Sequence, residues 1–133
     1  MSLVVPNQGE LIILQYMVNN TPAGDLILHL YKNDQALAED TVIGNLTEST
    51  EDGYAEQTLA GGSWSTALVS TNTATASHVE KTFTFTAAAT VYGYYVTDNS
   101  KATLLWAERF SGAPFVLPTG GGTIAITPKV TLD

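Results

Sequence analysis

The chain has no cysteine among its 133 residues, so it can form neither disulfide bonds nor thiolate metal sites. Charged residues make up only 14% of the sequence, against about 25% in an average soluble domain. Basic residues are especially scarce, because 5 Lys and Arg stand against 13 Asp and Glu, giving a formal net charge of −8. Phosphate-binding surfaces need clustered Lys and Arg, so we expect neither nucleic acid nor an anionic membrane as a partner.

Long hydrophobic runs are also missing. No apolar stretch approaches the roughly 20 residues that a membrane-spanning helix needs. The first residues lack the basic segment of a secretory signal, and the apolar run 11–14 is too short for its hydrophobic part. We therefore expect synthesis in the cytoplasm and no membrane partner. A chain of this length can bury one sizeable core, which predicts a single domain.

One segment, residues 8–18, has the spacing of an amphipathic helix. The apolar residues at intervals of three and four are Leu11, Leu14, Met17 and Val18. This spacing places them on one helical face. Asn7 is a suitable N-cap, and the Asn-Asn-Thr-Pro sequence at 19–22 is typical of a helix end. A buried strand is the alternative, because residues 11–14 are continuously apolar.

Residues 25–132 are predicted to form a β-sandwich. Apolar and polar residues alternate through much of this range, most clearly at 82–86, where two phenylalanines point inward. The strand at 90–97 is followed by a turn and by a plausible hairpin partner at 103–110. Seven or eight short strands favour an all-β sandwich of jelly-roll or immunoglobulin-like Greek-key type.

Other parts of this range are less regular. Residues 35–53 are acidic with few bulky apolar side chains, which predicts a long surface excursion. Residues 70–77 contain mainly Ser, Thr and Ala and are interpreted as a mobile loop. Pro128 interrupts the last strand and has no N–H to donate, so that strand should lie at an edge or carry a bulge.

No motif specifies a reaction. The only histidines are His29, interpreted as a partly buried strand residue, and His78, and no serine lies in a nucleophile elbow. Acidic residues between 34 and 52 could ligate Ca²⁺, but their spacing fits no EF-hand loop, and a solvated acidic loop is the preferred interpretation. We therefore assign no catalytic residue, no cofactor and no metal ligand.

Aromatic and charged residues in two strands indicate a possible interface. The strand 90–97 carries tyrosines on both faces, so one face could cover the core while the other meets a partner. Alternation places Glu108 on an apolar face with Leu104, Trp106 and Phe110, where an unpaired charge is costly. Glu108 either bonds locally, to the backbone, Lys101 or Lys129, or is an interface carboxylate.

Four stretches in order resemble small structural proteins encoded by tailed bacteriophages and prophages. They are Val-Pro-Asn-Gln-Gly-Glu-Leu at 5–11, Thr-Val-Tyr-Gly-Tyr-Tyr-Val-Thr at 90–97, Leu-Leu-Trp-Ala-Glu-Arg-Phe at 104–110 and Ile-Ala-Ile-Thr-Pro-Lys-Val-Thr-Leu at 124–132. The resemblance covers nearly the whole chain and includes no catalytic signature. It implies a virion component without enzymatic activity.

Among such proteins, small β domains that decorate phage heads commonly form trimers at three-fold positions. The resemblance therefore favours a head decoration or cement protein, with the major capsid protein or another virion protein as partner and a homotrimeric state. Residues 1–6 would be an apolar arm outside the sandwich that adds to a neighbouring subunit's sheet. The predicted interface residues are Leu3, Val4, Val5, Tyr92, Tyr94, Trp106 and Glu108.

Two alternatives remain open. A subunit of the tail, neck or fibre would share this fold and composition but assemble differently. A carbohydrate-binding module would instead stack sugars on exposed Trp64, Trp106 or Tyr94, and burial of these aromatic residues would exclude that function.

Overall fold

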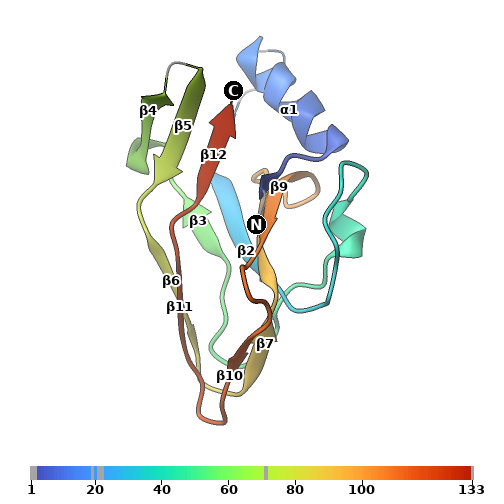
Figure 1. Cartoon of the computed structure of the whole chain (residues 1–133), viewed down its shortest axis with the longest axis vertical. Coiled ribbons are helices and arrows are strands. Elements are labelled where there is room, and N and C mark those ends of the chain that lie inside the picture. Colours follow the sequence, from blue (N-terminus) through green and yellow to red (C-terminus); the bar gives the residue numbers. More distant parts are fainter. Residues whose placement is uncertain (1–2, 19, 21–22, 71, 133) are drawn as a thin grey trace.

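The structure, a computed structural model, describes residues 3–18, 20, 23–70 and 72–132 (Figure 1). Its largest sheet has five antiparallel strands and includes the predicted hairpin. In spatial order the strands are β1 (Leu3–Val4), β9 (Leu104–Arg109), β8 (Gly93–Thr97), β2 (Leu26–Tyr31) and β3 (Gln57–Leu59). We call it the central sheet.

The remaining strands form three smaller antiparallel groups. They are β10 (Phe115–Leu117) with β7 (Ala89–Val91), β11 (Gly122–Ile126) with β6 (Lys81–Phe85), and β12 (Lys129–Leu132) with β5 (Thr73–His78) and β4 (Trp64–Ser70). The pairs β5–β12 and β6–β11 follow one another along a single long ribbon (Figure 1). Two short 3₁₀ turns, η1 (Ile43–Asn45) and η2 (Gly61–Ser63), complete the elements. The described residues thus form an all-β single domain with one α-helix, as predicted, whereas jelly-roll or Greek-key connectivity stays a prediction.

Two strand predictions need correction. Residues 70–77, expected to be a mobile loop, contain most of β5, which pairs with β4 on one side and β12 on the other. Small side chains gave this segment no hydrophobic signal, and its order comes from pairing on both edges. The last predicted strand is two strands, β11 and β12, because the ladder breaks at Pro128, whose carbonyl accepts a bond from the His78 N–H at 2.9 Å. The expected edge position is confirmed for β12.

The predicted helix is present as α1 (Asn7–Met17). The capping prediction is wrong, because Pro6 holds the N-cap position and Asn7 is the first helical residue. Gly9 is buried against β9, where an added Cβ would lie 2.1 Å from the carbonyl oxygen of Leu105. The helix therefore covers the part of the β9 edge that β1 leaves unpaired, which protects that edge from further strand addition.

The N-terminal arm is not separate from the domain. Leu3 and Val4 pair with Glu108 and Ala107 of β9, and Pro6 is fully buried. Extended backbone next to an unpaired strand edge gains hydrogen bonds by completing the sheet, and here the edge belongs to the same chain. Residues 1 and 2 of the predicted arm lie outside the described residues. No helix in the described part of the chain is long and apolar enough to cross a membrane.

The two faces of the central sheet are covered by different kinds of structure, one by strands and the other by an irregular segment. One face packs on β6, β11 and β7 and forms the main core, which includes Leu28, Val96 and the two predicted inward phenylalanines, Phe83 and Phe85. This is a sandwich-like arrangement of strands. The other face is covered by the segment 32–53, which has little regular structure, as predicted, and contributes the buried Leu46. We call these the strand-covered face and the loop-covered face.

A bulge and a break shift the side chains that alternation had assigned. Val96 lies opposite Trp106 but Thr97 lies opposite Leu104, so Leu105 is an extra residue in β9. Leu104 therefore packs on the loop-covered face rather than beside Trp106 as predicted. Strict alternation along 90–97 would also place Tyr92 and Tyr94 on one face. Tyr92 instead lies in the break between β7 and β8, and it packs on the opposite side from Tyr94.

Candidate functional site

The predicted interface residues do not form one exposed surface. Tyr94 and Trp106 are each only 3% exposed, because both belong to the strand-covered face. Their assignment to an interface is therefore corrected, since a buried side chain has no surface to offer a partner. Tyr92 is half-buried beneath the Arg109 guanidinium, 5.0 Å from the ring centre. Leu3, Val4 and Val5 are half-buried in the domain, and their contact with a partner stays a prediction.

Glu108 lies half-buried opposite Tyr94 in the β8–β9 ladder. Lys101, one of its expected partners, instead pairs with Glu56, and within the described residues Glu108 forms no ion pair. Burial raises the pKa of Tyr94, and the nearby Glu108 charge raises it further. The Tyr94 hydroxyl is buried without a formed hydrogen bond, although the Glu108 carboxylate lies close enough to affect its pKa. The charge of Glu108 thus affects a tyrosine of its own sheet, and its contact with a partner stays a prediction.

Two of the three aromatic residues considered for sugar binding are too deeply buried to stack on a sugar. Trp64 is half-buried and meets Trp106 edge-on, with ring centres 6.1 Å apart. A sugar needs an open ring face, and Trp106 and Tyr94 are buried. Burial therefore removes Trp106 and Tyr94 as stacking surfaces, whereas sugar stacking on the half-buried Trp64 stays a prediction.

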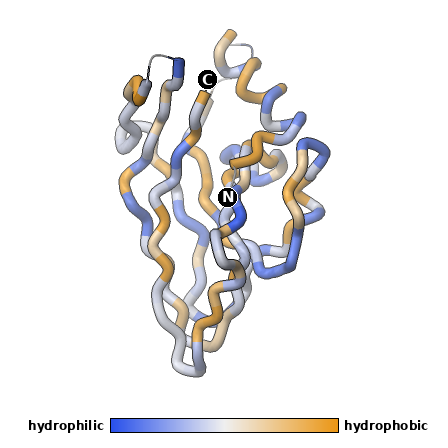
Figure 2. Tube along the Cα trace, in the orientation of Figure 1, coloured by the Kyte–Doolittle hydropathy of each residue, from blue (hydrophilic) through white to orange (hydrophobic). Residues whose placement is uncertain are grey.

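Hydrophobic residues of α1, β4 and β12 lie instead at the end of the molecule where these three elements terminate, as the hydropathy colours of the backbone trace show (Figure 2). We call this surface the apolar end. Its exposed residues are Leu11, Leu14, Met17, Val18, Leu68, Val69 and Leu132. The helical face predicted from spacing therefore exists but points to solvent, with Met17 73% exposed. The helix makes its buried contact through Gly9 and the half-buried Ile12 instead.

A groove of about 250 Å³ runs into the apolar end between α1 and β12. Its lining among the described residues is entirely hydrophobic and includes Ile13 from the helix, Val130 and Leu132 from β12, and the rings of Trp64 and Trp106. An adjoining depression shares Ile13, Val130 and Leu132, and it extends the groove along the helix. Contiguous exposed apolar surface of this kind marks a protein contact more often than a site of chemistry.

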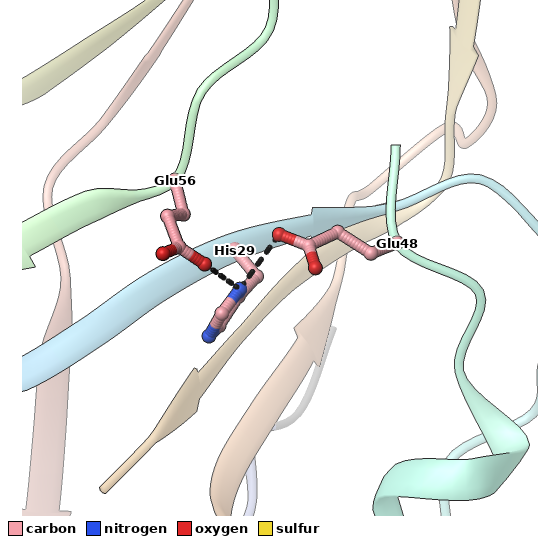
Figure 3. A group of neighbouring side chains, drawn as sticks. All are labelled: His29, Glu48 and Glu56. Atoms are coloured by element: carbon pink, nitrogen blue, oxygen red, sulfur yellow. Dashed lines mark hydrogen bonds and ion pairs between the residues drawn. The ribbon is translucent and has the colours of Figure 1, made fainter. Parts of the chain in front are cut away.

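A second, polar cluster lies on the loop-covered face (Figure 3). His29 projects from β2 and is 2% exposed, which confirms its burial in a strand. Its Nδ1 atom lies 2.8 Å from Oε1 of Glu48 and 3.5 Å from Oε2 of Glu56. Glu48 comes from the segment after η1, and Glu56 comes from the segment before β3. Both carboxylates point toward the imidazole ring from opposite sides (Figure 3).

The other side of the imidazole is also bonded. Nε2 of His29 lies 2.9 Å from the Thr97 hydroxyl, and the ring stacks on Tyr95 with centres 4.6 Å apart. Glu48, His29 and Thr97 thus form a carboxylate–imidazole–hydroxyl chain, the order of groups in a nucleophilic triad. Thr97 has no exposed surface, so a substrate cannot reach its hydroxyl. The chain of bonds fixes the ring and gives no support to nucleophilic catalysis.

Hydrogen bonds set the charge state of Glu48. Burial alone would raise the pKa of this carboxyl, but hydrogen bonds from His29 and Tyr54, together with electrostatic attraction to His29 and Lys101, hold the pKa below its ordinary value. The Tyr54 hydroxyl donates to Glu48 Oε1 at 2.8 Å and accepts from the Leu30 N–H at 3.1 Å. Burial raises the pKa of Tyr54 well above its ordinary range, so this hydroxyl remains a donor.

The acidic segment considered for Ca²⁺ does not converge on one point. Two of its carboxylates pair with different cations. Asp34 binds Arg109 at 2.7 Å, and Glu51 binds Lys32 at 3.2 Å. Among the described residues, His29, Glu48 and Glu56 are the one group of three or more that brings possible metal-binding atoms together.

No protein-family model matches the chain, and a search of curated proteins finds no match. The apolar end and the histidine cluster are therefore the two features from which a function can be inferred.

Sequence reasoning missed both features for identifiable reasons. Helical spacing identified the apolar face of α1 but could not show that Gly9 would turn that face away from the core. Glu48 and Glu56 are 19 and 27 residues beyond His29, and no motif links residues that a long excursion brings together. The available signal was a histidine inside an otherwise apolar strand, where burial requires polar partners.

Proposed function

We propose that the protein is a non-enzymatic structural subunit of a bacteriophage particle. It decorates the head and binds the shell through the apolar end. The observation that carries the proposal is the exposure of large hydrophobic side chains around a groove whose described lining residues are all apolar. A domain that worked alone in solution would gain stability by burying these side chains, at about 1.5–3 kcal/mol for each one fully buried.

The charge of the molecule supports contact with protein rather than with the packaged genome. With 13 acidic and 5 basic residues, the chain carries a formal charge of −8 and would be repelled by DNA phosphates. The partner is the major capsid protein or another virion protein. Homotrimers at three-fold positions would provide a closed, symmetric arrangement on a shell.

The apolar end replaces the N-terminal arm as the proposed shell contact. Leu3 and Val4 already pair with β9, and Pro6 is buried, so deletion of residues 1–6 would damage the domain itself. Weak shell binding by that deletion variant would therefore say nothing about a contact. Point substitutions on α1 test the proposal without this ambiguity, because the side chains concerned are exposed.

Binding to isolated particles tests the proposal. The purified protein is mixed with expanded empty heads and, separately, with tails of the phage or prophage that encodes it, and cosedimentation is measured. We expect stoichiometric binding to heads and a trimer on the shell by cryo-microscopy. Binding to tails and never to heads would reject head decoration and favour the tail, neck or fibre alternative.

A matched pair of variants tests the surface. The double substitution Leu14→Ser with Val18→Ser changes the apolar end, where Val18 is 66% exposed. The control Val116→Ser changes a valine of 68% exposure on β10 at the opposite end of the molecule (Figure 1). We expect shell affinity to fall about tenfold or more for the double variant and to stay unchanged for the control. Equal binding by both variants would show that the apolar end is not the contact.

A further inference from the structure

We propose that His29, Glu48 and Glu56 bind a divalent transition-metal ion of the Zn²⁺ type. The ligands would be Nδ1 of His29 and one carboxylate oxygen from each glutamate. These atoms come from three separate segments and lie within 4.8 Å of one another (Figure 3). Imidazole and carboxylate groups in this combination are ordinary ligands of zinc.

Two carboxylate oxygens face Nδ1 of His29, and a bound metal ion accounts for both of them better than a single hydrogen bond does. An imidazole nitrogen carries one hydrogen or one lone pair, yet two carboxylate oxygens face it, at 2.8 and 3.5 Å. The nearer oxygen, from Glu48, takes the hydrogen bond. In the described ranges, Oε2 of Glu56 then receives no hydrogen bond, although Lys101 binds the other oxygen of that carboxylate. A metal ion would accept a lone pair from all three groups.

The distances are also suitable. Zinc bonds of about 2.0–2.1 Å place the ligands of a tetrahedral site about 3.4 Å apart. The two separations at Nδ1, 2.8 and 3.5 Å, lie on either side of this value. Small rotations of the glutamate side chains, which are 35% and 32% exposed, would equalise them. The same exposure gives a metal ion access from solvent and leaves a fourth position for water.

The imidazole ring is already held in the orientation a metal needs. Metal-bound histidines usually donate their second N–H to a neighbouring acceptor, which fixes the ring and its tautomer. The Thr97 hydroxyl lies 2.9 Å from Nε2 and can accept that bond. Binding requires the free lone pair of Nδ1, so the ring hydrogen of the bound form is on Nε2. Any second ring hydrogen leaves to solvent.

The ligand set selects the kind of metal. Calcium and magnesium prefer oxygen ligands and take six or more of them, whereas a nearly buried imidazole nitrogen suits zinc and its first-row neighbours. Lys101 is the natural competitor, because its ammonium group already neutralises Glu56. Removing that ammonium group should therefore strengthen metal binding.

Titration calorimetry of the chelator-treated full chain with ZnCl₂ tests the proposal directly. We expect one zinc ion per chain, and a rise in Tm of about 5–10 °C when free zinc exceeds Kd a hundredfold. CaCl₂ should produce neither effect. In ¹⁵N spectra of the histidine rings, zinc should shift Nδ1 of His29 and place the ring hydrogen on Nε2. Absence of saturable one-to-one binding, or a shift confined to His78, would overturn the proposal.

Variants separate this site from adventitious binding. Glu56→Gln keeps the His29–Glu48 bond and should lower zinc affinity about tenfold or more. Glu51→Gln removes the same charge five residues earlier, from a carboxylate bound to Lys32, and should change affinity less than about twofold. Lys101→Met should raise affinity. Equal losses in both glutamine variants would show a general charge effect and overturn the site.

A substitution behind the ring tests the role of its orientation. Thr97→Val preserves the shape of a fully buried side chain but removes the acceptor for Nε2. We expect zinc affinity to fall about 10–100-fold. Circular dichroism without metal establishes that each variant is folded. Unchanged zinc affinity in folded Thr97→Val would show that the metal is not bound through His29.

Discussion

The two faces of the central sheet are closed by different means. On the strand-covered face, β6 and β11 bring Phe83, Phe85, Ile124 and Ile126 against the sheet, and the packing is almost entirely apolar. On the loop-covered face, an irregular segment is held by directional bonds, including the Arg109 to Asp34 ion pair at 2.7 Å. Apolar packing needs only shape and volume, whereas an irregular cover must satisfy its own backbone and side-chain polar groups.

This difference determines where polar chemistry can lie. The loop-covered face contains His29 and Tyr31, with the Tyr31 hydroxyl buried and its pKa raised to about 12, chiefly by burial. The segment that covers this face also supplies Glu48, which meets the histidine. A regular strand in its place would present alternate side chains only, at fixed spacing. The irregular cover therefore makes a polar cluster possible beneath it.

A substitution in the strand-covered face should lower the free energy of unfolding the most. Phe83 is fully buried and stacks on Tyr54, with ring centres 5.6 Å apart. Phe83→Ala should lower the free energy of unfolding by about 3–5 kcal/mol, because it leaves a cavity between two sheets that cannot close. Urea denaturation measures this loss. The control Phe115→Ala, at a ring that is 45% exposed, should cost less than about 1 kcal/mol.

A substitution in the loop-covered face should lower the free energy of unfolding by a smaller amount. Leu46 is 8% exposed and packs against the cluster that includes Tyr31 and Tyr95. Leu46→Ala should cost about 2 kcal/mol, the low end of the usual range, because an irregular segment can collapse into the space. The same denaturation experiment gives the value. A cost equal to that of Phe83→Ala would mean that both faces are equally rigid, contrary to the comparison.

The smallest expected effect is a dependence of folding stability on pH. Burial alone would raise the pKa of Glu51, but bonds from its own and the Thr50 backbone N–H and from Lys32 outweigh burial and lower the pKa. A lowered pKa in the folded state stabilises the protein above the ordinary value of 4.5, and this contribution is lost as pH falls through the folded value.

Glu51→Gln should therefore cost under about 1 kcal/mol at pH 7 and almost nothing near pH 3. Tm measured from pH 7 to pH 3 gives the comparison, with Phe83→Ala as the variant whose cost should not depend on pH. A constant difference between Glu51→Gln and the parent chain across this range would show that the ion pair with Lys32 contributes nothing.

The sequence by itself determined the local elements. Alternation located β6 and the β8–β9 hairpin, and spacing located α1, because these patterns depend on the backbone repeat alone. It failed for β5, where small residues form a strand only by pairing with β4 and β12 on both sides. It also failed for Leu104, because an extra residue in β9 reversed the face without any local signal.

Only the tertiary structure decided which surfaces and groups came together. Close contact between Gly9 and the Leu105 carbonyl orients α1, so a face that looks like core from its spacing is left in solvent. The covering segment 32–53 brings Glu48 to the buried imidazole of His29, and the stretch before β3 brings Glu56 to the same ring. Backbone periodicity is a property of neighbouring residues, whereas contacts across the sheet depend on how the whole chain fills space. That is why scarce charge and the absence of cysteine predict which classes of partner and site to expect but could not locate either site.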